Sequence, residues 1–267
     1  RERHRIGARI MTDKSQEIRD GVAVVTGAGR GLGRELSREL VAKGVQVAGI
    51  GRDAASVETL AAELGDAFLP ITADVADPDA IATAFGKIKA AKGAATIVIN
   101  NAAVYPRRDI LDETPQSFAQ TVNINLMGVF NCCHAALPDM LESGYGRIVN
   151  LSTFAHVSPA PAAAAYSVTK GAARTLTKSL VADLGDRFPD IVINDWIPGE
   201  LATPMGRPEG LDPKQAAEWG VRLALWHDPM LTGRLFDMNV EFLEPIGLKR
   251  KVLNKLIGRK RVPLRLS

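Results

Sequence analysis

Short β-branched stretches alternate with longer stretches rich in alanine and leucine along most of the chain. The short stretches have the composition of buried strands, and the longer ones have the apolar spacing of helices. The expected strands cover residues 22–26, 45–50, 68–73, 96–100, 147–151, 191–196 and 234–238. The expected helices cover residues 32–43, 54–64, 78–91, 115–142, 164–187 and 213–227.

This alternation indicates βαβ units, in which helices cover both faces of a parallel sheet. Right-handed crossovers favour a doubly wound sheet, whose ligands bind at the carboxyl ends of the strands. We therefore expect an α/β fold: a single-domain Rossmann-type doubly wound parallel sheet of about seven strands with helices on both faces. The domain is expected to span residues 21–240, between a flexible basic arm (1–20) and a basic extension (241–267).

The charge is concentrated at the two ends of the chain. Residues 1–10 carry four arginines and one glutamate, and residues 245–267 carry eight lysines or arginines and no acid. Between them, 21 basic and 29 acidic side chains leave the body with a net charge of −8, although the whole chain has +3. An acidic body argues against a nucleic-acid partner.

The composition is typical of a globular protein, with 46% apolar and 24% charged residues. No apolar stretch approaches the ~20 residues of a membrane span, and the first residues lack the apolar core of a secretory signal. Met11 is a candidate start. Cys132 and Cys133 are neighbours without another thiol, which indicates small apolar helix residues rather than a disulfide. We expect a cytoplasmic protein.

A glycine-rich turn follows the first expected strand. Glycines allow a tight turn and a close approach of the backbone to a pyrophosphate, and the N–H groups of the next helix bind the anion. Between the first strand and the first helix of an alternating chain, such a turn indicates a dinucleotide site. Its candidate residues are Gly27, Arg30, Gly31, Leu32 and Gly33.

The end of the second expected strand bears on the choice between NAD and NADP. NAD sites place an acid there, about 20 residues after the glycine turn, to bind the ribose 2′-OH. Here Gly51 takes that place and Arg52 follows, while Arg30 lies within the turn. Guanidinium groups suit a 2′-phosphate, so the sequence favours NADP. Asp53 follows directly and keeps NAD as the alternative.

Tyr166 and Lys170 are four residues apart in an expected helix, so their side chains share one face. A phenol has a pKa of about 10, and an adjacent ammonium lowers it. Tyr166 is therefore a candidate general acid/base. As an isolated pattern, this pair occurs by chance in many helices.

Further motifs follow in a fixed order. They are Asp74-Val75 after the third strand, Asn100-Asn101-Ala102-Ala103 after the fourth, Asn125, the pair Ser152-Thr153, and Pro198-Gly199 with Thr203. Together with the glycine turn, Tyr166 and Lys170, they make the chain resemble the short-chain dehydrogenase/reductase family from about Val22 to Met238. Its general pattern is similar to that of 3-oxoacyl-carrier-protein reductases.

The resemblance implies an oxidoreductase that transfers a hydride between NADP(H) and a carbonyl or secondary alcohol, with Tyr166 as general acid/base. It implies that Lys170 binds the nicotinamide ribose and lowers the pKa of Tyr166, and that Asn125 holds a water in a proton relay. The implied cofactor contacts are Asp74 and Val75 with the adenine, Asn101 and Ala102 in the groove, and Pro198, Gly199 and Thr203 on the nicotinamide side.

One position departs from the family pattern. The substrate-orienting serine is expected thirteen residues before the tyrosine, where this chain has Thr153, and Ser152 precedes it. Successive side chains of a strand point to opposite faces, so the two hydroxyls are not interchangeable. We favour Thr153 for this role. Ser152 is the alternative if the end of the strand is bulged.

The substrate side is less defined. Only residues 206–212 separate Pro204-Met205 from the last expected helix. This short lid suggests an open pocket for a small-molecule or carrier-bound carbonyl substrate, unless other loops or the extension close it. Tyr105, Arg107 and Arg108 are candidates for binding an anionic substrate group, although loop arginines are more often simply solvated.

Partners are inferred from the ends of the chain and from the resemblance. Residues 249–257 form a basic amphipathic segment, which suits an anionic membrane surface, but we favour docking onto a neighbouring subunit or the acidic body. The resemblance implies a homodimer or homotetramer through the helices at 115–142 and 164–187. The histidines have no ligand spacing, so no metal is expected. A non-catalytic NADP(H)-binding sensor or assembly protein is the alternative function.

Overall fold

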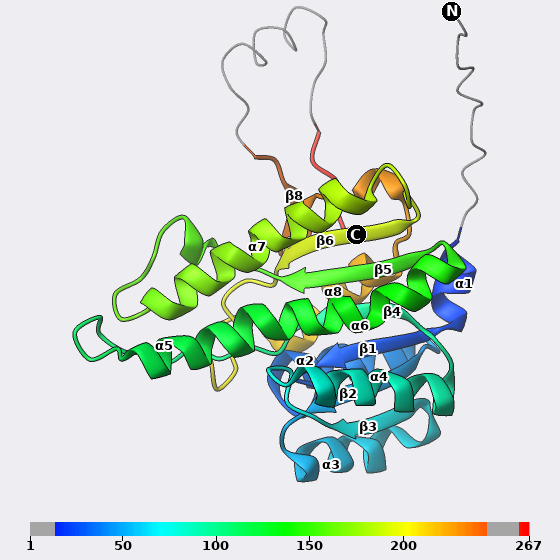
Figure 1. Ribbon diagram of the computed structural model, residues 1–267, viewed down its shortest axis with the longest axis horizontal. Coiled ribbons are helices and arrows are strands. Elements are labelled where there is room, and N and C mark those ends of the chain that lie inside the picture. Colours follow the sequence, from blue (N-terminus) through cyan, green and yellow to red (C-terminus); the bar gives the residue numbers. More distant parts are fainter. Residues whose placement is uncertain (1–13, 245–261, 267) are drawn as a thin grey trace, which may run out of the picture.

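The computed structural model describes residues 14–244 and 262–266. One eight-stranded sheet runs through the molecule, with helices packed on both sides (Figure 1). The strands are β1 (Val22–Thr26), β2 (Gln46–Gly51), β3 (Phe68–Thr72), β4 (Ala95–Asn100), β5 (Gly146–Leu151), β6 (Ile191–Ile197), β7 (Leu235–Asp237) and β8 (Val240–Phe242). The helices are α1 (Ser15–Asp20), α2 (Gly31–Ala42), α3 (Ala54–Leu64), α4 (Pro78–Lys92), α5 (Pro115–Val122), α6 (Gly128–Ser143), α7 (Ala164–Leu184) and α8 (Pro213–Leu225).

The sheet is doubly wound. Its strand order is β3-β2-β1-β4-β5-β6-β7-β8, and every pair is parallel except β7 with β8. The chain winds outward from β1 in one direction and from β4 in the other, so the loops after these two neighbours part and leave a crevice at their carboxyl ends. The predicted fold class is confirmed, and the antiparallel β8 is a strand that we did not expect.

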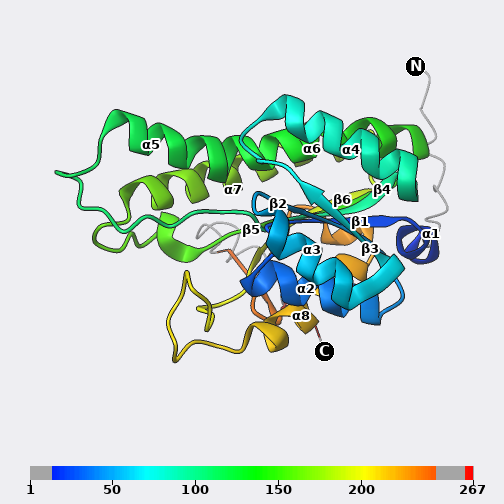
Figure 2. The ribbon, with the colours of Figure 1, turned by 90° about the horizontal axis from the view of Figure 1, so that it is seen from below.

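The helices form two layers that enclose the sheet. In Figure 2, α4, α5, α6 and α7 lie on one side, and α2, α3 and α8 lie on the other. Each layer encloses its own hydrophobic cluster. Every residue of β1, β4, β5 and β6 is buried, because both faces of these central strands are covered. Because both faces are covered, these strands appear in the sequence as nearly continuous apolar runs.

Arg147 of β5 is the largest charged side chain buried in this core. Its guanidinium donates hydrogen bonds to the carbonyls of Trp226 (3.0 Å), Leu223 (2.8 Å), Val192 (3.0 Å) and Ile148 (3.4 Å). Two of these carbonyls belong to the last turn and C-cap of α8, the negative end of the helix dipole. Burial lowers the pKa of Arg147 to about 9. The side chain ties α8 to the sheet through uncharged partners.

Two predicted domain boundaries are wrong. Residues 15–20 form α1, and Ile18 is fully buried against the core, so the expected flexible arm does not extend to residue 20. At the other end, β8 begins at residue 240, and the chain returns so that Leu264 N donates to Glu241 Oε2 at 3.1 Å. Leu266 is 3% exposed and packs in the core. Residues 1–13 and the amphipathic segment 249–257 lie outside the described residues.

The helix predicted over residues 115–142 is interrupted. A π-helical turn, Asn123–Met127, separates α5 from α6. Such a turn holds one residue more than a regular helix and is frequent at functional sites. It lies beside α7, at the end of the molecule where the strands terminate. In the part of the chain that the structure describes, every helix is too short or too polar to cross a membrane.

Candidate active site

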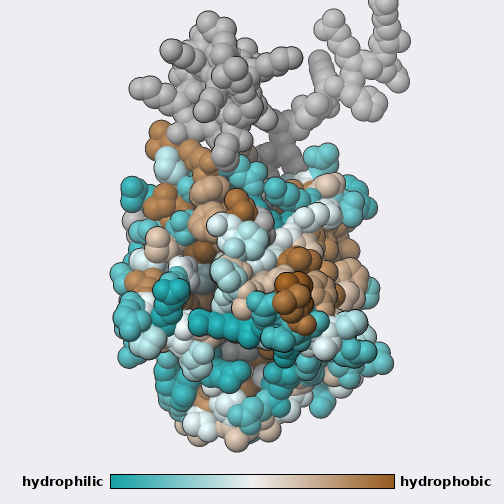
Figure 3. All heavy atoms as spheres, turned by 90° about the vertical axis from the view of Figure 1, so that its left-hand side faces the viewer, coloured by the Kyte–Doolittle hydropathy of each residue, from teal (hydrophilic) through white to brown (hydrophobic). Residues whose placement is uncertain are grey.

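A cavity of about 1220 Å³ opens at the carboxyl ends of the strands. Figure 3 looks onto this end of the molecule, where hydrophobic (brown) residues gather above and beside a band of hydrophilic (teal) ones. Loops after β1, β2, β4, β5 and β6 line the cavity, as the doubly wound topology requires. All predicted site residues line it except Gly33, Asp74 and Asn125.

The glycine turn after β1 has the geometry that only glycine tolerates. Gly27 and Gly31 have φ of 69° and 53°, in the left-handed region. A Cβ on Gly33 would lie 2.3 Å from the carbonyl oxygen of Gly27 and 2.6 Å from Nδ2 of Asn101. Gly33 therefore acts by packing α2 against the turn rather than by lining the cavity.

Thr26 joins the two sides of the crevice, a role that we did not predict. Its Oγ1 accepts hydrogen bonds from the backbone N–H groups of Asn101 (3.0 Å) and Ala102 (2.9 Å). The amide of Asn101 donates in return to the carbonyl of Thr26 at 2.8 Å. In the sequence, this role was indicated only by a hydroxyl residue at the end of the first strand. The loop after β4 is thus fixed at the edge of the glycine turn.

The turn fits the pyrophosphate of a dinucleotide. The N-cap residue of α2, Arg30, makes no side-chain hydrogen bond to the helix, unlike Asp77 and Asp212, which cap α4 and α8. The first N–H groups of α2 are thus left for an anion, which the helix dipole also attracts. Arg30 itself is exposed at the rim of the cavity.

At the end of β2, Arg52 and Asp53 both line the cavity. Arg52 is half-exposed, and its Nη1 lies 3.8 Å from Oδ2 of Asp74. The other carboxylate oxygen of Asp74 accepts from the backbone N–H of Ala76 at 3.0 Å, while Val75 lines the cavity. The cation Arg52 and the carboxylate Asp53 are therefore adjacent at the end of β2, where the sequence predicts contact with the ribose 2′ substituent.

Tyr166 lies at the start of α7 with its ring in the cavity. The ring of Tyr105 packs against it, with 4.4 Å between the centroids and a tilt of 33°. Burial raises the pKa of Tyr166 above its ordinary value, and a hydrogen bond between the Tyr166 and Thr153 hydroxyls opposes this shift in part. Burial dominates this shift, and the lowering of the Tyr166 pKa by the neighbouring lysine stays a prediction.

Lys170 lies one turn farther along α7 and is 4% exposed. Its Nζ donates to the carbonyl of Leu151, at the end of β5, at 2.8 Å. Burial lowers the pKa of Lys170 to about 8, and the negative charge of Asp195 opposes that shift. The ammonium is thus held at the cavity wall by a neutral acceptor and is still mostly protonated at neutral pH.

The two adjacent hydroxyls after β5 have different surroundings. Thr153 bonds Tyr166, and its Oγ1 also accepts from the backbone N–H of Ala155 at 3.2 Å. Ser152 is 6% exposed, and its Oγ is buried without a hydrogen-bond partner. The geometry brings Thr153, not Ser152, to the candidate acid/base.

Asn125 lies within the π-helical turn and is fully buried. Its Oδ1 accepts from the N–H of Val104 at 2.8 Å, and its Nδ2 donates to the carbonyl of Val104 at 2.9 Å and to Oγ1 of Thr169 at 3.2 Å. The side-chain amide is therefore engaged in fixing the loop after β4 to α7. That Asn125 holds a relay water stays a prediction.

Two arginines of the described chain, Arg107 and Arg108, lie at the outer part of the cavity near the tyrosines. Arg108 is bound to Glu113 at 2.9 Å, so its charge is compensated. The guanidinium of Arg107 lies 5.6 Å from the ring centroid of Tyr105 and makes no ion pair with any described residue. Within residues 14–244 and 262–266, no three His, Cys, Asp or Glu side chains are grouped to hold a metal ion.

The short segment between β6 and α8 forms a compact loop. Ala202 N donates to the carbonyl of Leu211 at 2.9 Å, and Leu211 N donates to the carbonyl of Glu200 at 2.8 Å. Its first half, including Thr203 and Met205, lines the cavity. We predicted a short segment here, and the structure confirms it, since α8 begins at Pro213. These paired backbone contacts hold the loop at the cavity edge.

A doubly wound sheet with an uncapped glycine turn and a Tyr/Lys pair in one cavity defines a dinucleotide-dependent oxidoreductase. Residues 21–214 match the family model described as short chain dehydrogenase. The chain belongs to the short-chain dehydrogenase/reductase family, and it is accordingly an oxidoreductase that acts on carbonyl or alcohol substrates.

The chain spans about three quarters of the length of the curated relatives that it matches. The chain is 35% identical to carbonyl reductase [NADPH] 2 of Sus scrofa over 73% of this chain and 77% of the relative. It is 35% identical to the 2-dehydro-3-deoxy-L-rhamnonate dehydrogenase (NAD(+)) of a Sphingomonas species over 68% and 73%. It is 34% identical to the 3-oxoacyl-[acyl-carrier-protein] reductase FabG of Staphylococcus aureus over 68% and 75%. The family uses NAD or NADP, and these names include both.

Proposed function

We propose that the protein transfers a hydride between NADP(H) and a carbonyl or secondary alcohol, with Tyr166 as the general acid/base. The observation that carries the proposal is the hydrogen bond between the Tyr166 and Thr153 hydroxyls in the cavity that the glycine turn also lines. A proton donor and an anion-binding helix start thus share one cavity. A bound nicotinamide supplies or accepts the hydride in such a site.

The side chains divide the remaining work. Tyr166 donates its proton to the carbonyl oxygen during reduction and takes it back from the alcohol during oxidation. Its raised pKa keeps it a phenol at neutral pH, which is the donating form. Thr153 orients the substrate oxygen toward Tyr166, and Lys170 places a positive charge next to the developing oxyanion. Tyr105 and Arg107 form the wall that the rest of the substrate meets.

The preference for NADP rests on the loop after β2. Arg52 lies at the cavity rim with its charge only loosely paired to Asp74, so it is available to a 2′-phosphate. Asp53 is the adjacent carboxylate and supports NAD instead. Titration of the wild type with NADPH and NADH, followed by tryptophan fluorescence, tests the choice. Arg52→Gln should weaken NADPH about tenfold and leave NADH unchanged. Tighter NADH binding by the wild type would overturn the assignment.

A panel of ketones, aldehydes and acyl-carrier thioesters tests the catalytic proposal, with NADPH oxidation followed at 340 nm. Turnover of one class that is lost in Tyr166→Phe supports it. The alternative, a non-catalytic sensor or assembly protein, predicts tight cofactor binding with no turnover across the panel. The intact pair of Tyr166 and Lys170 disfavours that alternative, because a sensor needs neither a proton donor nor its cation.

The remaining elements of the proposal concern partners. We infer a small-molecule or carrier-bound carbonyl substrate, since the cavity holds about 1220 Å³ and its rim carries Arg107 for an anionic group. A homodimer or homotetramer in the cytoplasm is proposed from the family alone. Light scattering at two concentrations of the full chain measures the oligomeric state.

A further inference from the structure

Three cations lie along one face of α7, one turn apart. Lys170, Arg174 and Lys178 are at positions i, i+4 and i+8, so their side chains leave the helix in a row. Lys170 is the candidate catalytic lysine at the cavity end of this row. Like charges at this spacing repel one another, and the repulsion is strongest for the two that are buried, Lys170 and Arg174.

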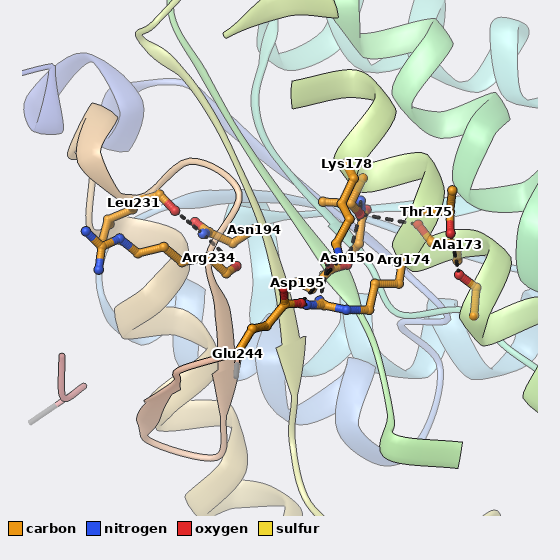
Figure 4. A network of polar contacts seen from close by, with 12 residues as sticks. Asn150, Ala173, Arg174, Thr175, Lys178, Asn194, Asp195, Leu231, Arg234 and Glu244 are labelled. Atoms are coloured by element: carbon orange, nitrogen blue, oxygen red, sulfur yellow. Dashed lines mark hydrogen bonds and ion pairs between the residues drawn. The ribbon is translucent and has the colours of Figure 1, made fainter. Parts of the chain in front are cut away.

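Two carboxylates from other elements lie between these cations. Asp195 of β6 accepts from Nη1 of Arg174 at 2.9 Å, and Glu244, just after β8, binds Nη2 of the same guanidinium. Glu244 also lies 3.3 Å from Nζ of Lys178. Figure 4 shows Arg174 reaching across to Asp195 and Glu244. Charges of opposite sign therefore alternate from the cavity to the surface.

Asp195 is 2% exposed and is held in place by hydrogen bonds besides the ion pair. Oγ1 of Thr177 donates to its second oxygen at 2.9 Å, and Nδ2 of Asn150 donates to Oγ1 of Thr177 at 2.9 Å. Nδ2 of Asn100 in turn donates to Oδ1 of Asn150 at 2.8 Å. This chain of bonds crosses β4, β5 and β6. A carboxylate fixed so thoroughly has a defined position relative to its neighbours.

Strand register brings Asp195 next to the anchor of Lys170. In the pairing of β5 with β6, Asn150 is opposite Asp195, and Leu151 is opposite Trp196. The carbonyl that accepts from Lys170 belongs to Leu151. The ammonium is therefore bound about one residue, ~3.3 Å along the strand, beyond the rung that carries the carboxylate.

We propose that Asp195 is a positioning residue for the candidate active site: it is the buried countercharge that keeps Lys170 protonated. Lys170 has only a neutral carbonyl as its hydrogen-bond partner, and burial disfavours a charged amine there. A carboxylate one rung away offsets that penalty through the low dielectric of the interior. Arg174 and the Thr177 hydroxyl favour the ionised form of Asp195, and Glu244 offsets the remaining positive charge of the row. The catalytic consequence rests on the proposed function, whereas the charge coupling does not.

The groups that face Lys170 and Asp195 are few. From α7 they are Tyr166, Arg174 and Lys178, and the described part of the segment after β8 contributes Glu244. The side chains that β5 and β4 contribute, Asn150 and Asn100, do not titrate. Beyond them, Cys133 of α6 contacts Asn100, and burial raises the pKa of its thiol to about 12, so it stays neutral. Among the described residues, Asp195 is the buried carboxylate whose negative charge favours the protonated form of Lys170.

Titration of Lys170 itself tests the proposal without any turnover. The full-length protein is produced with ¹³C-labelled lysine, the Lys170 ¹³Cε signal is assigned by its loss in Lys170→Met, and its shift is followed from pH 6 to 11. Asp195→Asn should lower the pKa of Lys170 by about one unit. Asp195→Asn/Arg174→Gln removes both partners of the buried pair, so it should keep the fold while showing a smaller decrease, because the repulsion from Arg174 is removed as well.

Glu244→Gln is the matched control, because it removes a carboxylate from the same network at a position farther from Lys170. It should leave the pKa of Lys170 unchanged. An unchanged pKa in both Asp195 variants would overturn the proposal. So would an equal decrease in Glu244→Gln, since the effect would then not come from Asp195.

The pH profile of kcat/KM supplies the catalytic readout. In each Asp195 variant, the alkaline limb should move to lower pH by the amount that the Lys170 titration shows for that variant. A purely structural role would instead lower the rate equally at every pH. If the carbonyl panel shows no turnover, the proposed function fails, and the lysine titration still decides the coupling.

Discussion

The cavity has two halves that are built on different principles. Around β1, α2 and β2, the site is made of backbone: glycines with positive φ, a helix start without a cap, and a glycine whose Cβ would meet Gly27 at 2.3 Å. Around β5, α7 and β6, it is made of polar side chains: the half-buried Thr153 and Tyr166 and the buried Lys170 and Asp195.

Because of this difference, the two halves are sensitive to different kinds of substitution. The backbone half requires the absence of side chains, so added volume damages it, while most changes of charge nearby leave its shape intact. The side-chain half depends on hydroxyls and charges that perturb one another, so substitutions of equal volume disrupt it. Substitutions matched in volume or in charge can separate the two.

The largest expected effect is in the side-chain half. Tyr166→Phe removes only the hydroxyl that transfers the proton, and kcat should fall about 10³-fold. Circular dichroism and NADPH affinity should not change. Tyr145→Phe is the control, because Tyr145 does not line the cavity. Retention of more than about a tenth of the wild-type kcat in Tyr166→Phe would remove Tyr166 from its role.

A single methyl group should disrupt the backbone half. Gly33→Ala places a Cβ 2.3 Å from the carbonyl oxygen of Gly27, which should cost about 3 kcal/mol in the free energy of unfolding and abolish tight NADPH binding. Gly86→Ala in α4 is the matched control, since nothing lies within 4 Å of its added Cβ. It should stabilise the protein by roughly 0.5–1 kcal/mol. Denaturant unfolding measures both, and equal stability of the two variants would refute the steric account.

The adjacent hydroxyls provide a finer test. Thr153 bonds Tyr166, whereas Oγ of Ser152 has no partner. Thr153→Ala should lower kcat about 10²-fold, and Thr153→Ser should restore most of it. Ser152→Ala should leave kcat close to that of the wild type. If Thr153→Ala turned over at the wild-type rate, the substrate-orienting role would pass to another residue.

The smallest effect concerns stability against pH. Burial raises the pKa of Asp195 from its ordinary 3.8 to about 6, so the folded protein binds more protons than the unfolded chain between these values. The contribution of Asp195 to stability therefore falls as the pH rises through this window. Relative to Asp195→Asn, the wild type should lose roughly 2 kcal/mol between pH 4 and 7.

Unfolding in denaturant at fixed pH measures this difference, and parallel stability curves would contradict it. Glu244 provides a control of opposite sign. Arg174 lowers the pKa of Glu244, so its contribution is present at neutral pH and is lost on acidification. Relative to Glu244→Gln, the wild type should gain stability as the pH rises.

Periodicity predicted the fold because both faces of the sheet are covered. Runs such as those of β1 and β4 are buried at every position and mostly apolar, and the helices between them carry a single apolar face. Local patterns did not predict β8, which has three residues and is held by β7 and by the returning chain near Leu264. Nor did they predict α1, which is stabilised by burial of Ile18 rather than by its own propensity.

The candidate site was predicted where its residues belong to motifs and missed where they act across the fold. The glycine turn, Tyr166 and Lys170 all line one cavity, as their order along the chain indicates. The Tyr-x-x-x-Lys spacing gave no sign that burial raises the pKa of Tyr166, because burial depends on tertiary packing. Asp195 gave a signal that we did not use: an acid inside a mostly apolar stretch, which is costly to bury unless it has partners.

The π-helical turn has a consequence for insertions and deletions. Residues 123–127 accommodate one residue more than a regular helix would between α5 and α6. Each residue of an α-helix advances the chain by ~100°. Deleting one residue here would regularise the helix, rotate α5 by that angle relative to α6, and carry the amide of Asn125 away from Val104. A shortening that looks harmless in a linear alignment would thus detach the loop that flanks the cavity.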